Sequence, residues 1–300
     1  MEFHAAYRTA GFCYPVPFDQ WNEGGVFEQR SDLRGVTKDG RLAPRLSYAY
    51  KETRRMVIDT LREVARHPVD GIAILHNRRP PLVGYEPPLV EGFIDSYHQD
   101  PRELADDDER WLRYRTIALT EFHRELRAAL DELAVEQGRA PIHITACVSN
   151  HEENLLHGLD VKTLVGEGLI DTLIPYTSAP GLDSAAEAWI TEAQVDQWVS
   201  LTRDTSCALS MSLLPRHVSP ENYRRKAAML YKAGVETFFC WDSAGASGRA
   251  NYSPSWEALQ RLGHRDEVLS WAGSEMAKSV RAPVPVTHLA EYDLSFQTPG

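Results

Sequence analysis

Acidic residues follow two apolar runs of this sequence, and their carboxyl groups are the side chains best suited to acid–base chemistry. Asp242 ends the run at residues 235–242, and Glu152 and Glu153 come just after the run at residues 142–149. A carboxylic acid can protonate a leaving group, and a carboxylate can act as a base or a nucleophile. Because adjacent residues rarely face the same way, we expect one of Glu152 and Glu153 to be a solvated loop acid.

Polar and aromatic residues at the ends of the apolar runs are candidates for holding a ligand. An arginine side chain binds carboxylates, phosphates and hydroxyl groups, and an aromatic ring offers a flat face for stacking. The candidate binding residues are Arg8, Tyr14, His76, Asn77, Arg78, Asn150, Tyr176 and Trp241. Each has a plainer alternative, since an arginine can form a salt bridge and an aromatic residue can belong to the core.

The spacing of the histidines matches no familiar metal-binding motif. His143, His151 and His157 lack the HExxH arrangement that places two ligands on one helix face. No GxSxG, Walker-type or GxGxxG motif follows an apolar run, which argues against an esterase, a nucleotidase or a dinucleotide-binding protein. The sequence therefore predicts no bound metal and no cofactor.

Short apolar runs alternate with longer amphipathic segments along the chain, and these elements must position the residues above. The expected strands are residues 3–13, 70–77, 142–149, 170–176, 207–214 and 235–242. The expected helices are residues 50–66, 106–137, 161–167, 192–202, 220–233 and 255–272. Several strands are apolar on both faces, as strands covered on two sides are. The pattern predicts an α/β fold of the (β/α)8 TIM-barrel type, with active-site residues at the C-terminal ends of the strands.

Two acids open strands instead of ending them. Asp70 and Asp171 lie at the starts of the runs at residues 70–77 and 170–176. In a barrel this edge is concerned with stability, so we expect both side chains to have structural roles.

Six visible strands do not close an eight-stranded barrel. We therefore expect either two further strand–helix units upstream of Met1 or an open sheet, and we favour the former. The strands at residues 3–13 and 235–242 would then end an unclosed sheet, with a gap for about two strands at a spacing near 4.8 Å. Because neither strand carries the Lys or Pro that guards a deliberate edge, we expect the isolated chain to aggregate or form homo-oligomers through this opening.

The length of the chain indicates one main domain. A barrel uses about 250 residues, so we assign residues 1–281 to the barrel and residues 282–300, with Pro283 and Pro285, to a tail or linker. The segments at residues 15–46 and 78–101 have no clear period and follow strands. In a barrel such loops usually shape the binding cleft.

Charge and composition restrict the partners of the chain. The formal net charge is -11 and the isoelectric point about 5.5, so the overall field repels nucleic acids and anionic membrane surfaces. No apolar run approaches the roughly 20 residues of a membrane span, and no signal segment opens the sequence.

Cys13, Cys147, Cys207 and Cys240 have no CxxC spacing and are expected to be buried free thiols. We expect a soluble, cytoplasmic protein.

Several short motifs occur in the order found in a known group of barrel proteins. They are Val69-Asp70-Gly71-Ile72, Arg78-Arg79-Pro80-Pro81, Tyr85-Glu86-Pro87, Gly158-Leu159-Asp160-Val161, Glu167-Gly168-Leu169-Ile170-Asp171, and Tyr231-Lys232-Ala233-Gly234-Val235 before Trp241-Asp242. Over residues 3–271 the chain resembles glycoside-hydrolase-like proteins related to family 10-type glycosyl hydrolases. In that family the Asp-Gly-Ile strand usually carries a second acid at the position occupied here by Leu75.

The resemblance implies a barrel that binds or hydrolyses a carbohydrate at its C-terminal face. Asp242 and Glu153 form the best carboxylate pair, because glycosidases place two carboxyl groups on either side of the scissile bond. The residues expected to orient the sugar are Arg78, Asn150, Tyr176 and Trp241. Because Leu75 can neither donate a proton nor carry a charge, the alternative is a catalytically inactive barrel that binds a sugar or another small ligand. An unrelated lyase or isomerase is a third interpretation, since one barrel supports many reactions.

Overall fold

The computed structural model describes residues 2–9, 26–77, 81–149, 153–176, 192–213, 220–240, 259 and 261–278. The chain forms two compact units, with the first running from Met1 to Asp171 and the second beginning at Thr172. The assignment of residues 282–300 to a tail stays a prediction, because these residues lie outside the described ranges.

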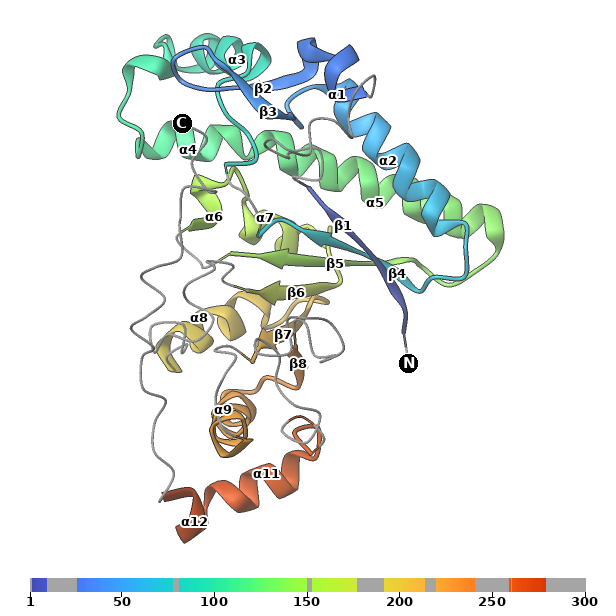
Figure 1. Cartoon of the computed structure of the whole chain (residues 1–300), viewed down its shortest axis with the longest axis vertical. Helices are drawn as coiled ribbons and strands as arrows, with labels where there is room; N and C mark the ends of the chain where they lie inside the picture. The colour runs from blue at the N-terminus through green and yellow to red at the C-terminus, as the bar shows by residue number, and fades with distance from the viewer. Residues whose placement is uncertain are drawn as a thin grey trace. The chain divides into compact units, whose positions relative to one another are not determined.

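Three parallel strands form the centre of the first unit (Figure 1). They are β1 (His4–Arg8), β4 (Gly71–Leu75) and β5 (His143–Val148). The register places Gly71 of β4 between His4 of β1 and His143 of β5, and it continues without a shift to Leu75. The C-terminal ends of the three strands therefore lie at one edge of the sheet.

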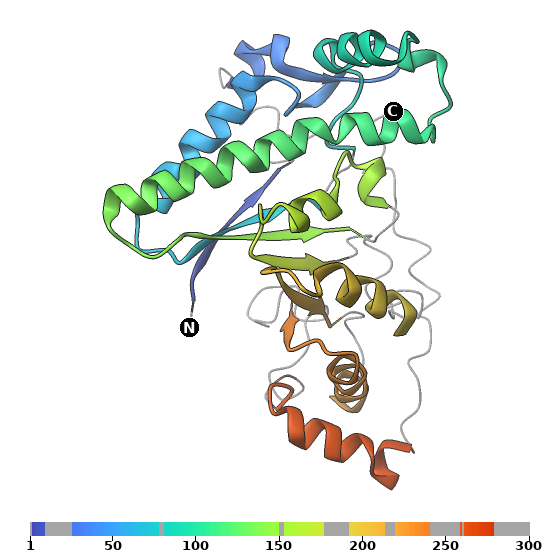
Figure 2. The same ribbon diagram turned by 180° about the vertical axis from the view of Figure 1, so that it is seen from behind.

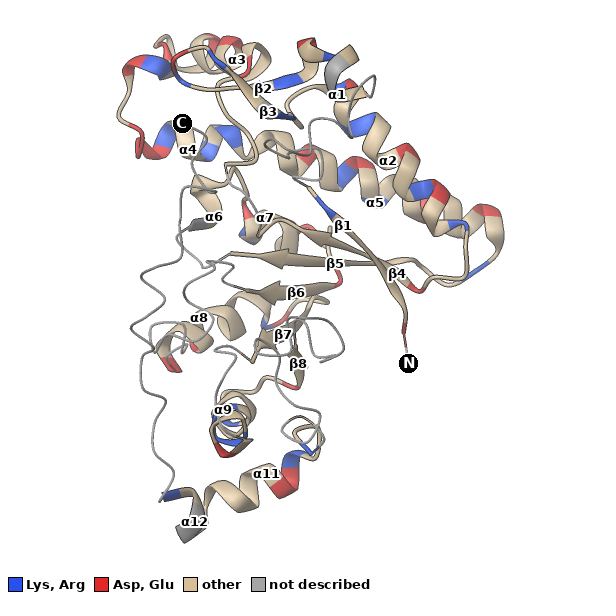
Figure 3. Cartoon of the chain, in the orientation of Figure 1, with Lys and Arg blue, Asp and Glu red and all other residues tan. Residues whose placement is uncertain are grey.

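Two long helices, α2 (Lys51–Ala65) and α5 (Ile117–Gln137), lie side by side in the first unit (Figures 1 and 2). In α2 the buried residues recur every three or four positions, as on the core-facing side of an amphipathic helix. Arg54 of α2 donates to both carboxylate oxygens of Glu125 on α5, at 2.8 and 3.0 Å. Charged residues of both signs alternate along these helices, whereas the strands carry few (Figure 3).

The other helical elements of the first unit are short. They are α1 (Val26–Gln29), η2 (Ser31–Leu33), α3 (Pro87–Tyr97), η3 (Pro101–Glu103), α4 (Glu109–Arg115), α6 (Glu153–Leu156) and α7 (Val161–Gly166). The helix predicted at residues 106–137 is divided into α4 and α5 at Thr116, whose hydroxyl donates to the Arg113 carbonyl at 2.7 Å.

A hairpin and a helix occupy segments that we predicted to be irregular. β2 (Arg34–Val36) and β3 (Leu42–Leu46) pair antiparallel within residues 15–46, and α3 lies within residues 78–101. The hairpin turn is closed by the Gly40 amide, which donates to the Thr37 carbonyl at 2.9 Å, and Gly40 adopts a φ of 81°. The prediction was wrong here because β2 and β3 are too short to show a clear two-residue alternation.

The second unit contains the parallel strands β6 (Thr172–Pro175), β7 (Ala208–Ser212) and β8 (Thr237–Phe239). Its helices are α8 (Glu192–Thr202), α9 (Pro220–Lys232), α11 (Arg265–Ala272) and α12 (Glu275–Lys278). Tyr231 of α9 donates to the Leu262 carbonyl at 2.8 Å, and Arg224 of the same helix lies 5.1 Å from the centre of the Trp271 ring. The first contact joins α9 to the turn before α11, and the second joins α9 to α11 itself.

The six predicted strands are all present, in the order β1-β4-β5-β6-β7-β8. This confirms the α/β fold of the parallel-barrel type. Among the described strands, β1 comes first and β8 last in that order. The gap between these two strands, and oligomerisation through it, stay predictions.

Three of the four cysteines lie within the described residues. Cys147 and Cys207 are buried and Cys240 is half-buried, whereas Cys13 lies outside the described residues. No helix in the described ranges has the length and apolar character needed to cross a bilayer.

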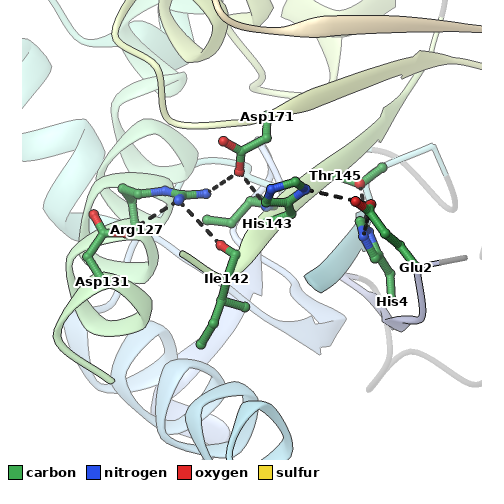
Figure 4. Close-up of polar contacts among 9 residues, drawn as sticks. Glu2, His4, Arg127, Asp131, Ile142, His143, Thr145 and Asp171 are labelled. Atoms are coloured by element: carbon green, nitrogen blue, oxygen red, sulfur yellow. Dashed lines mark hydrogen bonds and ion pairs between the residues drawn. The ribbon is translucent and has the colours of Figure 1, made fainter. Parts of the chain in front are cut away.

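Asp70 and Asp171 accept backbone hydrogen bonds at the starts of the strands, which supports their predicted structural roles. Asp70 accepts from the Phe3 amide at 2.7 Å. Asp171 accepts from the Ile144 amide at 2.7 Å and from the Arg127 guanidinium of α5 at 2.6 Å (Figure 4). The second carboxylate therefore joins a helix to the start of a strand.

Replacing Asp171 with Ala is expected to lower the free energy of unfolding by about 1–3 kcal/mol, because the Ile144 amide and Arg127 lose their shared acceptor. Asp131→Ala is the matched control, since exposed Asp131 pairs with the same arginine at 3.4 Å. We expect that control to change stability by about 0.5 kcal/mol or less. Urea unfolding curves measure both changes, and equal destabilisation by the two variants would contradict this assignment.

Candidate functional site

Buried polar residues follow the C-terminal ends of the strands in the first unit. Thr9 follows β1, His76 and Asn77 follow β4, and Ser149 follows β5, and all four are buried. Thr9 is held by Leu75, whose carbonyl accepts from the Thr9 amide at 3.3 Å and from the Thr9 hydroxyl at 3.1 Å. In barrel enzymes the active site forms at this edge, so these positions define the candidate site.

The structure places only part of the predicted site. His76 and Asn77 are at this edge, and Arg8 ends β1 with an exposed side chain. Tyr176 is buried in the second unit, where its ring packs edge-on against Phe239 at 5.8 Å. The predicted residues outside the described ranges are Tyr14, Arg78, Asn150, Glu152, Trp241 and Asp242, and Glu153 is described only as the first residue of α6.

His76 is hydrogen-bonded to a second histidine, His123 of α5. Their Nε2 atoms lie 2.8 Å apart, so one ring donates and the other accepts. Burial lowers the pKa of His76 well below its usual value and lowers the pKa of His123 to about 3. Both rings are therefore neutral near pH 7, and in the described part of the chain neither Nδ1 atom has a hydrogen-bond partner.

Sequence reasoning missed His123. It lies on the buried face of α5 beside Leu119, Phe122 and Leu126, all of which are fully enclosed. A histidine within an apolar helical stripe was the available signal, because a buried imidazole needs a polar partner. That partner lies 47 positions away in the sequence.

A third histidine, His157, has a lowered pKa for two reasons. Burial is the larger cause and the nearby positive charge of Arg115 is the smaller, and together they bring the pKa to about 4. Arg115 ends α4 and donates to the carbonyls of Val83 at 3.3 Å and Leu156 at 3.1 Å. This arginine joins α4 to the loop after β4 and to α6.

Two tyrosines form a further buried polar group near the end of β1. The Tyr48 hydroxyl lies 3.3 Å from the Tyr7 hydroxyl and donates to the Thr9 carbonyl at 3.1 Å. Burial raises the pKa of both phenols above the usual value, so both remain neutral at ordinary pH. Their chemistry is hydrogen bonding, not proton abstraction.

Glu86 is the one fully buried carboxyl group in the described ranges. Its two oxygens accept from the Gly84 amide at 2.9 and 3.0 Å, and it also bonds with the Ser47 side chain and the Val36 backbone. Burial raises the pKa of Glu86 despite these bonds. Because the carboxyl group is enclosed and bonded to the hairpin and its own loop, its role is structural.

One surface hollow is defined in the second unit. It lies between α9 and α11 and is lined by Arg224, Arg261, Glu267, Val268 and Trp271. No strand-end residue contributes to it, and the ion pair between Arg261 and Glu267 accounts for its charges. We do not assign a function to it.

The comparisons with known proteins identify the fold. No family model matches the chain, and no curated protein matches it. Among solved structures, it is similar to the PgaB (BpsB) glycoside hydrolase domain from Bordetella bronchiseptica, at 13% identity and a TM-score of 0.57, over 86% of this chain and 74% of that chain.

Two β-galactosidases are similar over a larger share of this chain. A polyextremophilic β-galactosidase from Halorubrum lacusprofundi matches at 13% identity and a TM-score of 0.57, over 90% of this chain and 49% of that one. Gan42B, a family 42 β-galactosidase from G. stearothermophilus, matches at 12% identity and a TM-score of 0.55, over 92% of this chain and 47% of that chain. This chain thus spans about half the length of these enzymes. At such identities the likeness shows the fold alone, an α/β fold of the parallel-barrel type.

Proposed function

We propose that this chain binds a carbohydrate at the C-terminal ends of its parallel strands and hydrolyses a glycosidic bond there. The supporting observation is the fold that it has in common with the glycoside hydrolase domain of PgaB and with family 42 β-galactosidases. In barrels of this kind the active site is built from the loops after the strands. The relation to family 10-type glycosyl hydrolases, which the sequence motifs indicate, is part of this proposal.

Asp242 and Glu153 are the proposed catalytic carboxyl groups, and Glu152 is the alternative to Glu153. Glu153 begins α6 after β5, and Asp242 follows β8 in the sequence. One carboxyl group would protonate the leaving oxygen while the other acts as nucleophile or base. The proposed sugar-binding residues are Arg8, Tyr14, His76, Asn77, Arg78, Asn150, Tyr176 and Trp241. The mechanism requires no metal and no cofactor.

We expect Asp242→Asn to lower the hydrolysis rate by at least about 10²-fold, because the amide can neither donate a proton as an acid nor accept one as a base. A panel of chromogenic glycosides identifies the substrate, and the rates of wild type and variant are then compared on it. Glu153→Gln should produce a loss of similar size. The control is Glu63→Gln on the exposed face of α2, which should retain full activity.

These variants separate a catalytic role from a structural one. Circular dichroism and unfolding curves establish that each variant is folded before its rate is compared. Unchanged turnover by folded Asp242→Asn would remove Asp242 from the mechanism. A loss of hydrolysis rate in Glu152→Gln, with no loss in Glu153→Gln, would assign the second catalytic carboxyl group to Glu152.

The second candidate function is carbohydrate binding without cleavage. It is favoured by Leu75, a buried apolar residue at the position where the resembled family usually has an acid. Equilibrium binding to oligosaccharides, measured by calorimetry, distinguishes the two functions. Binding with no turnover across the glycoside panel supports the inactive barrel, and the absence of both rejects a carbohydrate function.

A further inference from the structure

Two imidazoles and a carboxylate meet at the N-terminal edge of the strands in the first unit, opposite the candidate site (Figure 4). Nε2 of His4 lies 3.3 Å from an Oε atom of Glu2, and Nδ1 of His143 lies 3.7 Å from the same oxygen. Ligand atoms around a tetrahedral zinc ion, each about 2.0–2.2 Å from the metal, are separated by about 3.3–3.6 Å. The three groups are therefore spaced closely enough to coordinate one ion.

The register of the strands and a glycine create this arrangement. His4 begins β1 and His143 begins β5, and both are register partners of Gly71 on the strand between them. A Cβ atom at Gly71 would lie 2.8 Å from the His4 ring and 2.8 Å from the His143 carbonyl oxygen. Both distances are too short for an ordinary contact. The glycine leaves the space across which the two imidazoles approach each other.

A hydrogen bond orients the first imidazole. Nδ1 of His4 lies 3.1 Å from the hydroxyl of Thr145, which is buried on β5. A proton on Nδ1 that is donated to this hydroxyl leaves the Nε2 lone pair directed towards Glu2. Metal-binding histidines usually have such an outer partner, which fixes the tautomer and the direction of the ring.

Hydrogen bonding alone does not account for all three residues. The His4–Glu2 contact at 3.3 Å is a hydrogen bond only if Nε2 carries the proton, and the 3.7 Å between His143 and Glu2 is too long for a hydrogen bond. The exposed fractions of the His4, His143 and Glu2 side chains are 19%, 44% and 61%. An ion can therefore reach the group from solvent, and water can complete its coordination.

We propose that Glu2, His4 and His143 bind a divalent transition-metal ion of the Zn²⁺ type, with water as a further ligand. Imidazole nitrogen suits Zn²⁺, Ni²⁺ and Cu²⁺, whereas Mg²⁺ and Ca²⁺ prefer oxygen ligands. The bound ion fastens the start of β1 to the start of β5 across β4. This role is independent of carbohydrate chemistry at the opposite edge, and it differs from the sequence prediction that no metal is bound.

Calorimetric titration of the chelator-treated, tag-free chain with Zn²⁺ tests the site. We expect zinc to bind and to raise the unfolding temperature, while Mg²⁺ does neither. His4→Gln and His143→Gln should each lower zinc affinity by at least about a hundredfold, since loss of an outer-shell partner alone costs about 10–100-fold. Thr145→Val should lower it by about tenfold through loss of the orienting hydroxyl.

His67→Gln is the matched control, because this exposed histidine lies outside the group and should leave zinc affinity unchanged. Circular dichroism without zinc shows whether each variant is folded, and Glu2→Gln at an exposed position gives a further test should a histidine variant fail to fold. Absence of zinc binding, or equal binding by wild type and by folded His4→Gln and His143→Gln, would overturn the proposal.

Discussion

Lowering the pH from 7 to 5 is expected to reduce the free energy of unfolding by several kcal/mol, because three histidines are held neutral in the folded chain. Burial keeps the pKa of His76 well below 6.5, that of His123 at about 3 and that of His157 at about 4. In the unfolded chain each imidazole regains a pKa near 6.5. Unfolding below that pH therefore takes up protons.

The sign and size of the effect follow from proton linkage. Because the unfolded state binds more protons than the folded state below about pH 6.5, stability falls as the pH falls. The slope is about 1.4 kcal/mol per pH unit for each histidine, so each loses about 2 kcal/mol between pH 6.5 and pH 5. The loss is complete only below the folded pKa values, at about 3 for His123 and about 4 for His157.

Glu86 opposes this trend but cannot cancel it. Its pKa is raised in the folded state, so its contribution to stability is greatest at low pH and is lost as the pH rises through that raised value. One carboxyl group acts against three histidines. The net result is acid destabilisation that begins about two pH units above the titration of ordinary carboxyl groups.

Urea unfolding curves at pH 7, 6 and 5 measure the effect. In His123→Gln the slope of stability against pH should fall by about one third, whatever the effect of the substitution at pH 7, because one of three proton-binding groups is removed. Val135→Ala, at an exposed position on the same helix as His123, should leave the slope unchanged. If the free energy of unfolding of the wild type falls with pH by less than about 1.4 kcal/mol per pH unit, the slope expected for one histidine, the three rings are not held neutral by burial.

The strands and most helices could be predicted because their patterns are local. Each expected strand contains an observed one, and the helix expected at residues 192–202 coincides with α8. The α3 helix was missed because its buried Leu89, Val90 and Phe93 follow an irregular, proline-containing stretch. Its start depends on Glu86, whose backbone carbonyl accepts the first helical hydrogen bonds.

The polar groups could not be predicted in the same way, because they depend on residues that are distant in sequence. His76 meets His123 across 47 positions, and His4 meets Thr145 across 141. A one-dimensional pattern places a residue at the end of a strand, but packing decides which side chain from another element reaches it. The carboxyl groups of Asp242 and Glu153 remain predictions, because their side chains lie outside the described part of the chain.

The second large effect is expected at Gly84, in the loop that follows β4. The Gly84 amide donates to both oxygens of buried Glu86, and the next amide, of Tyr85, donates to the Val36 carbonyl at 2.7 Å. A Cβ atom at Gly84 would collide with the same Val36 carbonyl oxygen. Backbone atoms cannot rotate aside as the end of a flexible side chain can, so the loop and the β2–β3 hairpin would have to separate.

Gly84→Ala is therefore expected to lower the free energy of unfolding by about 2–6 kcal/mol. Overpacking of this kind costs about 1–3 kcal/mol. Displacement of the amide also leaves the Glu86 carboxyl group buried without one of its donors, which costs about 1–3 kcal/mol more. Gly166→Ala is the matched control. Gly166 ends α7 with no atom near its Cβ position, and alanine there should stabilise the chain by about 0.5–1 kcal/mol.

Urea unfolding at pH 7 compares the two alanine variants, and opposite signs are the expected result. Because residues 81–86 follow shortly after the strand-end residue Asn77 in the sequence, their separation from the hairpin should also weaken any carbohydrate binding by folded Gly84→Ala. Wild-type stability in Gly84→Ala would mean that the loop is not held against β2. The hairpin would then be unsuited to position the strand-end residue Asn77.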